Sequence, residues 1–403
     1  MRAPRVSSYA VCVVTAVLGA MFSVAVHGQL SSPARHRQVR DLLYVTANGT
    51  LYVPPHHLGV GILVFDVAND FKFVKRIPTW DVPVSQKPEL VVGIGASVTT
   101  GLLYVTVPTR IAAFDLTTDK KVWEQTYDGQ CCEMIAVSPD GETLYLNSFY
   151  KSHMYAVDAK TGTLKTKVEY SPSFEGKRVE RAHNVNWSPD GSKVFMSGSG
   201  PNDNYITVAD PKTHSMVKAI GPFGESVRQF TTNGTGTTLF SNTVGLCGFD
   251  VADVTIGEVL GRVECPGDWK AKVMADPDLM LGHGAPSHGI AMSADETEIW
   301  VADGVNSALH VFDATVTPPR FKTSVKTRVQ PYTLSFSLDD RYVFSASGDV
   351  VDAKTKKVVA VLKDEYGRDV YSEKFIQATF GDDGKMLRAN QRFSKGQVGV
   401  AKN

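Results

Sequence analysis

The chain has 403 residues, with 42 Lys and Arg against 42 Asp and Glu, so its formal net charge is zero. This balance argues against nucleic acid or an anionic membrane surface as a partner, because both select proteins with an excess of positive charge. The length exceeds that of an ordinary single domain, but repeat architectures reach it as one unit.

The N-terminal segment is predicted to be an export signal. Arg2 and Arg5 precede an uncharged apolar stretch over residues 9–26, and small residues follow where a signal peptidase would cut. We therefore expect a signal peptide at residues 1–28, one domain at residues 29–403 and a secreted or periplasmic location. An uncleaved anchor is the alternative, because the stretch is nearly long enough to span a bilayer. No membrane contact is expected beyond this segment.

A tight-turn motif recurs at a spacing of about forty residues, which is typical of propeller blades. In its clearest form, Ser-Pro-Asp-Gly, the Pro fixes φ, the Asp offers a local hydrogen bond and the Gly permits a positive φ. The copies lie at residues 136–141, 186–191, 291–295 and 335–340, with weaker copies at 232–234 and 381–384.

Each turn is followed by alternating β runs. Period-two patterns of β-branched and aromatic residues between turn signals predict strands. One set of runs lies at residues 102–107, 143–146, 193–196, 238–240, 298–302 and 341–345. The next set ends in aspartate and lies at residues 62–66, 111–115, 154–158, 205–210, 247–250 and 309–313. Because these aspartates recur in most repeats, we interpret them as caps of the following turn.

Four short strands per repeat, with almost no helical pattern, predict an all-β fold: a seven-bladed β-propeller with four antiparallel strands per blade. A partial C-terminal unit is expected to close the ring against the first blade, which removes exposed strand edges. The units begin near Leu42, Glu89, Cys131, Arg181, Ser226, Ser287 and Gln330, and the partial unit begins near Lys374. A ring of six or eight blades and a pair of stacked sheets are the alternatives.

Five cysteines occur, of which four lie outside the predicted signal. Cys247 and Cys265 fall on consecutive predicted strands, so a cross-strand disulfide between them is geometrically reasonable in an oxidising compartment. Cys131 and Cys132 are adjacent. The sequence leaves open whether they form a vicinal disulfide or stay free, and it favours a structural disulfide over a nucleophile.

Three parts of the repeat carry a family resemblance: Tyr44-Val45-Thr46-Ala47-Asn48, the Ser138-Pro139-Asp140-Gly141 turn with Leu144-Tyr145-Leu146, and residues 287–293 with 299–303. They resemble the YVTN, or lactonase-like, seven-bladed propeller superfamily over nearly the whole mature chain. The resemblance implies the fold. It does not select a function, since that superfamily includes surface-layer and periplasmic proteins, sugar-lactone hydrolases and heavy subunits of quinone-dependent amine dehydrogenases.

The first strand of each propeller blade lines the axis, so equivalent positions in successive blades converge on one circle. Counting back five residues from the turn serine gives Glu133, His183, Arg228, His288 and Tyr332, with Val92 and Ile376 in the second and terminal units. Two imidazoles, a carboxylate, a phenol and a guanidinium suit acid–base chemistry on a small polar or carboxylated molecule. The same side chains in a water-filled channel can also simply pair with water and each other.

These observations lead to a set of site predictions. The predicted catalytic residues are His183, His288, Glu133 and Tyr332, and the predicted substrate-binding residues are Arg228, His283 and Tyr150. The cofactor is unknown; the sequence lacks HExxH and paired CxxC motifs, and if a divalent metal binds, its ligands would be His183, His288 and Glu133. Two long loops, at residues 171–181 and 264–287, could form a lid over the mouth of the channel.

Three functions remain open at this point. The first is an exported enzyme of the lactone hydrolase, lyase or isomerase type. The second is a non-catalytic propeller that binds a ligand, a cell-wall component or a protein partner on the cell surface or in the periplasm. The third is an electron-transfer subunit of a quinone enzyme, which requires a small cysteine-rich partner.

Overall fold

The computed structural model describes residues 39–47, 60–80, 91–128, 131–148, 151–169, 181–198, 200, 203–280, 285–391 and 393–400. All described residues belong to one compact unit, Gln38–Asn403. The predicted signal peptide lies outside them and stays a prediction. Within the described ranges, no helix has the length and apolar character needed to cross a membrane.

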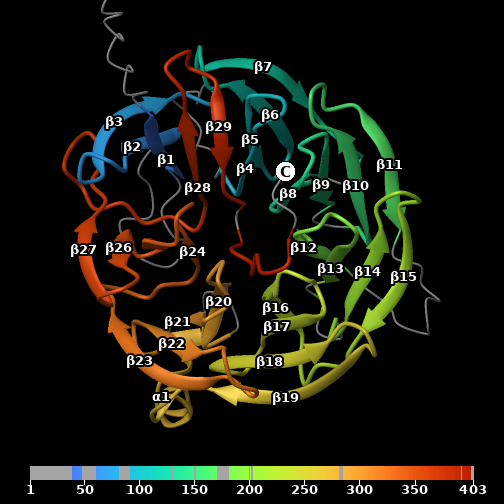
Figure 1. Cartoon of the computed structure of the whole chain (residues 1–403), viewed down its shortest axis with the longest axis vertical. Coiled ribbons are helices and arrows are strands. Elements are labelled where there is room, and N and C mark those ends of the chain that lie inside the picture. The colour runs from blue at the N-terminus through green and yellow to red at the C-terminus, as the bar shows by residue number, and fades with distance from the viewer. Residues whose placement is uncertain are drawn as a thin grey trace, which may run out of the picture. The chain divides into compact units, whose positions relative to one another are not determined.

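Seven antiparallel sheets follow one another in a ring, as Figure 1 shows. This arrangement confirms the predicted all-β, seven-bladed propeller. Six sheets have four strands each, in chain order from the axis to the rim. We number the blades from the one that contains the N-terminal strand.

The strand bounds of blades 1 to 3 are as follows. Blade 1 contains β1 (Arg40–Thr46), β2 (Ile62–Asp66), β3 (Lys72–Ile77), β28 (Phe375–Phe380) and β29 (Met386–Ala389). Blade 2 contains β4 (Gly93–Ser97), β5 (Leu102–Val107), β6 (Arg110–Asp115) and β7 (Lys120–Gln125). Blade 3 contains β8 (Ile135–Val137), β9 (Thr143–Asn147), β10 (His153–Asp158) and β11 (Leu164–Glu169).

Blades 4 and 5 continue the pattern. Blade 4 contains β12 (Ala182–Trp187), β13 (Val194–Gly198), β14 (Ile206–Asp210) and β15 (Ser215–Ile220). Blade 5 contains β16 (Val227–Thr232), β17 (Thr238–Thr243), β18 (Gly248–Asp253) and β19 (Glu258–Glu264).

Blades 6 and 7 complete the ring. Blade 6 contains β20 (Ser287–Met292), β21 (Glu298–Asp303), β22 (Ala308–Asp313) and β23 (Arg320–Lys326). Blade 7 contains β24 (Leu334–Phe336), β25 (Tyr342–Ser345), β26 (Asp349–Asp352) and β27 (Lys357–Val361). Between blades 5 and 6 the chain forms α1 (Trp269–Ala275) and the 3-10 turn η2 (Pro277–Met280).

The repeated turn is held by one hydrogen-bond pattern. In blade 4, Ser188 Oγ donates to Asp190 Oδ1 at 2.6 Å, and the backbone N–H of Lys193 donates to Ser188 Oγ at 2.9 Å. The same serine-to-aspartate bond recurs in blades 3, 6 and 7, at Ser138, Ser293 and Ser337. This local chemistry explains why the motif marks the end of each inner strand.

The aspartates that end the third strands cap the next turn, as predicted, with one correction in blade 5. For example, the backbone N–H of Thr117 donates to Asp115 Oδ1 at 2.8 Å. In blade 5 the cap is Asp253, which accepts from Thr255 N at 2.6 Å. Asp250 instead lies inside β18 and pairs with Arg262, because that strand extends three residues beyond the predicted end.

The ring closes in blade 1 between the two ends of the described chain. Strand β1 pairs with β2 on one side and with β28 on the other, with Tyr44 opposite Ile376. The side-chain amide of Gln377 also donates to Asp41 Oδ1 at 2.7 Å. The predicted closure by N- and C-terminal segments is therefore confirmed, with β28 between β1 and β29 in the closing blade.

The C-terminal segment, residues 390–400, continues past the closing blade toward the axis (Figure 1). The backbone N–H of Phe336 donates to Ser394 Oγ at 2.7 Å, and Gly396 N donates to Thr232 O at 2.9 Å. The ammonium of Lys395 donates to Trp187 O at 2.6 Å. This segment thus joins blades 4, 5 and 7 at the end of the inner strands where the turns lie.

The hydrophobic core lies between the blades. Seven buried clusters occur, and each combines side chains of two adjacent blades. In the cluster between blades 3 and 4, for example, Tyr145 packs edge-on against Trp187 with ring centroids 5.2 Å apart. Because every interface is apolar, the polar side chains at the inner strand starts are placed by a rigid frame.

Candidate functional site

The predicted ring residues lie at the starts of the inner strands. His183, Arg228 and His288 are the second residues of β12, β16 and β20, and Glu133 and Tyr332 precede β8 and β24 by two residues. Their common level follows from the repeat register. All five lie at the opposite end of the inner strands from the turns and from the C-terminal segment.

Glu133 is the centre of this group. Its Oε2 lies 3.0 Å from Nε2 of His183, in the next blade, and its Oε1 lies 3.5 Å from the ammonium of Lys374. Lys374 also lies 3.3 Å from Glu373 Oε2 and is only 3% exposed. Side chains from blades 1, 3 and 4 therefore meet at one carboxylate.

Arg228 adds a second fixed positive charge. Its guanidinium is largely buried, and burial lowers its pKa while the charge of Glu133 acts in the opposite direction. Among the described residues, neither Arg228 Nε nor His183 Nδ1 has a hydrogen-bond partner, although both atoms are buried. Buried polar atoms are normally satisfied, so these two nitrogens mark a place for a water or a ligand. We call Glu133, His183, Arg228, Glu373 and Lys374 the axial cluster.

Glycines allow the inner strands to approach closely at this level. A Cβ on Gly93 in β4 would lie 2.6 Å from the backbone oxygen of Glu133. A Cβ on Gly289 in β20 would lie 2.6 Å from Thr333 Cα. Neither clash can be relieved by a side-chain rotation, because both contacts are with backbone atoms. The two glycines thus set how near the neighbouring strand starts lie.

Two asparagines position the backbone of the axial cluster. Asn147 Oδ1 accepts the N–H groups of Glu133 at 2.7 Å and Met134 at 2.9 Å, and its Nδ2 donates to Ala182 O at 3.2 Å. Asn184 Nδ2 donates to Arg228 O at 2.9 Å. These residues were missed from the sequence, since their role appears only when the blades are brought side by side.

His288 and Tyr332 lie on the adjacent blades 6 and 7, and both are buried. The Tyr332 hydroxyl donates to Gln330 Oε1. The structure brings the side chains of Glu133 and His183 together, and the strand register places His288 and Tyr332 at the same level of the ring. His283 and Tyr150 lie outside the described residues, so their predicted roles are not placed.

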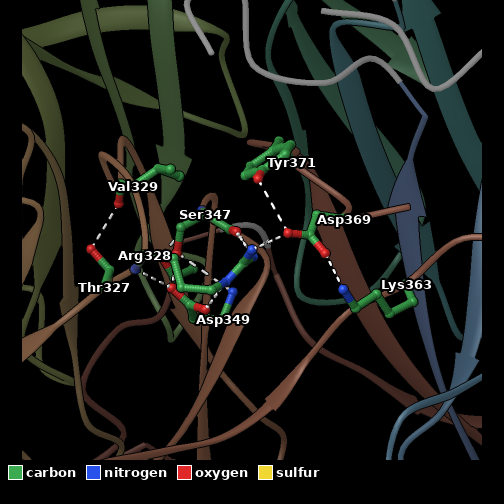
Figure 2. A network of polar contacts seen from close by, with 9 residues as sticks. Thr327, Arg328, Val329, Ser347, Asp349, Lys363, Asp369 and Tyr371 are labelled. Carbon is green, nitrogen blue, oxygen red and sulfur yellow. Dashed lines mark hydrogen bonds and ion pairs between the residues drawn. The ribbon is translucent and has the colours of Figure 1, made fainter. Parts of the chain in front are cut away.

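A polar network fixes the segments that lead into this site, as Figure 2 shows. Arg328 Nε donates to the fully buried Asp349 at 2.6 Å, and its other nitrogens reach Ser347 O and Asp369. Asp369 is also paired with Lys363, and that hydrogen bond holds the pKa of its carboxyl below the usual range. Arg328 lies four residues before Tyr332, and Asp369 five residues before Lys374. The network therefore joins the two segments that carry those residues.

Cys131 and Cys132, directly before Glu133, are bonded to each other and fully buried. A vicinal disulfide is one of the two states that the sequence left open. The expected bond between Cys247 and Cys265 is absent: both are buried thiols. They lie at the paired ends of β18 and β19, and the Cys247 thiol has Cys265 and Asp303 as polar neighbours.

The structure also corrects the prediction for residues 264–287 as a lid over the mouth of the channel. The described part of residues 264–287 forms α1 and η2, and α1 lies at the outer edge of the ring in Figure 1. Trp269 is buried among side chains of blades 5 and 6, and this packing holds the helix at the rim. The described part of the segment therefore does not cover the axis. The other loop predicted for the lid lies outside the described residues up to residue 180.

A cavity of about 840 Å³ lies at the turn end, beside the C-terminal segment. Its lining includes Asp340, Arg388 and Lys395. Burial raises the pKa of Asp340 to about 6, and its carboxylate accepts the N–H of Ala294 at 2.6 Å. Because its charged lining groups already bond to the protein, this cavity offers less unmet hydrogen-bonding capacity than the axial cluster.

Among the described residues, the ligand atoms of Glu133, His183 and His288 do not converge into a metal-binding group. Those of Cys247, Cys265 and His310 do. Comparison with known proteins adds no identification: no family of known proteins matches the chain, and no curated protein matches it.

Proposed function

We propose that the axial cluster binds a small polar or carboxylated molecule and transfers protons to and from it. The supporting observation is the pair formed by His183 Nε2 and Glu133 Oε2 at 3.0 Å, with His183 Nδ1 left without a partner among the described residues. A carboxylate that holds one imidazole nitrogen orients the ring and leaves the other to exchange a proton.

Four members of the axial cluster have a role in this proposal. Glu133 orients His183, and Lys374 fixes Glu133 through its second oxygen, 3.5 Å away. His183 Nδ1 takes a proton from water or from a carbon next to a carbonyl. Arg228 binds the carboxylate of the molecule or the negative charge that develops on its carbonyl oxygen. Hydrolysis of a lactone, or an elimination or isomerisation next to a carboxylate, can use these groups.

We make two further proposals, on the superfamily of the chain and on its export. We place it in the YVTN or lactonase-like superfamily on the quoted repeat motifs and the seven-bladed fold. We also propose that it is exported, on the basis of the N-terminal apolar segment. His288 and Tyr332 belong to the proposed site as the groups that face the molecule from blades 6 and 7.

A structural tie is the second candidate function for the same residues. Both oxygens of Glu133 are already paired within the protein, and Lys374 lies between two carboxylates. Such a network links blades 1, 3 and 4 without any ligand, as paired buried charges often do. In that case the propeller binds its partner elsewhere, through its loops.

Crystals grown with a panel of small lactones and carboxylates distinguish the two. The proposed site requires difference density within hydrogen-bonding distance of His183 Nδ1 and Arg228 Nε. Binding measured by calorimetry is then expected to weaken at least about tenfold in Arg228→Met, since a charged hydrogen bond is lost. Unchanged binding in this variant, or density only at another face, would assign the cluster to the structural role.

A further inference from the structure

A second group of chemically reactive side chains lies between blades 5 and 6, away from the axial cluster. Cys247 directly precedes β18, Cys265 directly follows β19, and His310 lies in β22. One sulfur from each cysteine and one ring nitrogen of His310 all lie within 4.8 Å of one another. The three residues are 0%, 4% and 4% exposed, so solvent is excluded from the group.

The backbone brings the two thiols together. The N–H of Cys265 donates to the carbonyl of Cys247 at 2.8 Å, which continues the β18–β19 ladder by one residue pair. Burial raises the pKa of the Cys247 thiol, and the neighbouring Cys265 and Asp303 act in the same direction. The two sulfur atoms therefore lie together in an enclosed place.

His310 is oriented from both sides. Its Nε2 lies 2.9 Å from Asp303 Oδ2, and its Nδ1 lies 2.8 Å from Ser324 Oγ. Asp303 is completely buried and accepts two hydrogen bonds from Asn306, from N at 2.9 Å and from Nδ2 at 2.6 Å. In metal sites of proteins, hydrogen bonds to the atoms of a side chain that do not bind the metal commonly hold that side chain in position.

We propose that Cys247, Cys265 and His310 bind one Zn²⁺ ion, and that the carboxylate of Asp303, 2.9 Å from His310 Nε2, moves toward the ion as the fourth ligand. Two thiolates, an imidazole and a carboxylate are a donor set that zinc accepts in tetrahedral geometry, whereas magnesium and calcium require oxygen ligands. Binding replaces the two thiol protons, which are released to solvent. The Nδ1–H group of His310 then donates a hydrogen bond to Ser324 Oγ, and Nε2 binds the ion.

Four protein ligands and a buried setting define a structural site. The ion joins β18 and β19 of blade 5 to β21 and β22 of blade 6, next to the helix α1 whose Trp269 packs in the same cluster. The proposal is independent of the chemistry assigned to the axial cluster. The zinc site and a Cys247–Cys265 disulfide exclude each other, because the disulfide would remove both sulfur ligands.

The test uses the full chain, purified without chelator from zinc-supplemented medium. Elemental analysis is expected to give one zinc ion per chain, and mapping of alkylated peptides without reductant is expected to find Cys247 and Cys265 as free thiols. The variants Cys247→Ala and His310→Gln lose the metal. The control Cys131→Ser/Cys132→Ser keeps it, because those residues lie in blade 3.

Cobalt substitution supplies a readout that does not depend on a folded variant. Co²⁺ added to the metal-depleted natural chain is expected to give the intense thiolate-to-metal absorption of a two-cysteine site. Three results would overturn the proposal. The natural chain could hold no zinc after dialysis against zinc, or a variant with both cysteines replaced could retain it. The third is recovery of Cys247 and Cys265 from the natural chain as one disulfide-linked peptide pair.

Discussion

Glu133 Oε2 and His183 Nε2 lie 3.0 Å apart, although the residues are separated by 50 positions and belong to different blades. The closed ring produces this contact by placing equivalent inner-strand positions next to one another. Lys374 approaches the same carboxylate from the closing blade. The cluster therefore depends on the correct closure of the propeller, and its energetic contribution can be measured.

Replacing Lys374 with Met is expected to destabilise the fold. The change leaves Glu133 and Glu373 without their shared cation in a buried place, which costs about 3 kcal/mol of unfolding free energy. Chemical denaturation measures the loss. The control Lys363→Met removes a lysine that is 52% exposed, and its expected effect is below about 0.5 kcal/mol. Equal effects of the two changes would disprove a buried network.

Lys395 is expected to make stability depend on pH. Its ammonium is buried, and this desolvation lowers its pKa from 10.5 to about 7. Between those values the unfolded chain holds a proton that the folded chain has released, so the free energy of unfolding rises with pH. The contribution is about 1.4 kcal/mol per pH unit above pH 7.

Comparing the natural chain with Lys395→Met isolates that slope. Denaturation curves at several pH values are expected to show a steeper rise for the natural chain, up to the ordinary lysine pKa. Parallel curves for the two proteins would mean that Lys395 stays charged in the folded state.

Gly93→Ala tests the close approach of β4 to Glu133. The added Cβ meets backbone oxygen at 2.6 Å, so the strands must separate, and we expect a loss of about 1–3 kcal/mol. Gly261→Ala is the matched control in β19, since its Cβ meets nothing within 4 Å. It is expected to be neutral or slightly stabilising. Equal melting temperatures of the two variants would show that the close approach of β4 to Glu133 does not affect stability.

Export is tested by the first residue of the mature protein. Sequencing of the chain recovered from the periplasm or medium is expected to begin at Gln29, because the predicted cleavage follows Gly28. A product that retains residues 1–28 in the membrane fraction would support the uncleaved anchor instead.

The fold could be predicted because its signals are local. The turn at Ser188 and Asp190 is stabilised by bonds among residues within the motif itself, and period-two runs identify the strands without any long-range information. The position of Glu133 relative to His183 was also predictable, since both follow the same register. Membership of the YVTN or lactonase-like superfamily stays a proposal, which rests on the repeat motifs and the fold.

Other features depend on contacts that no local pattern records. Counting back from the terminal turn selects Ile376, yet the charged member of the site is Lys374, just before β28. The C-terminal segment beyond β29 has no repeat to align, so its path toward the axis was not predicted. Cys247 and His310 meet only because blades 5 and 6 pack side by side. The sequence instead suggested a disulfide between Cys247 and Cys265.

The central claim is that His183 exchanges a proton with a bound molecule. The most direct test follows a panel of small lactones and carboxylates by NMR in the presence of the natural chain, of His183→Asn and of His214→Asn. His214 is the control because it lies in a turn of blade 4, bonded to Tyr145 and away from the cluster. We predict turnover by the natural chain and the control, and a loss of at least about 100-fold in His183→Asn at unchanged melting temperature. Equal turnover in His183→Asn, or none by the natural chain, would contradict the account.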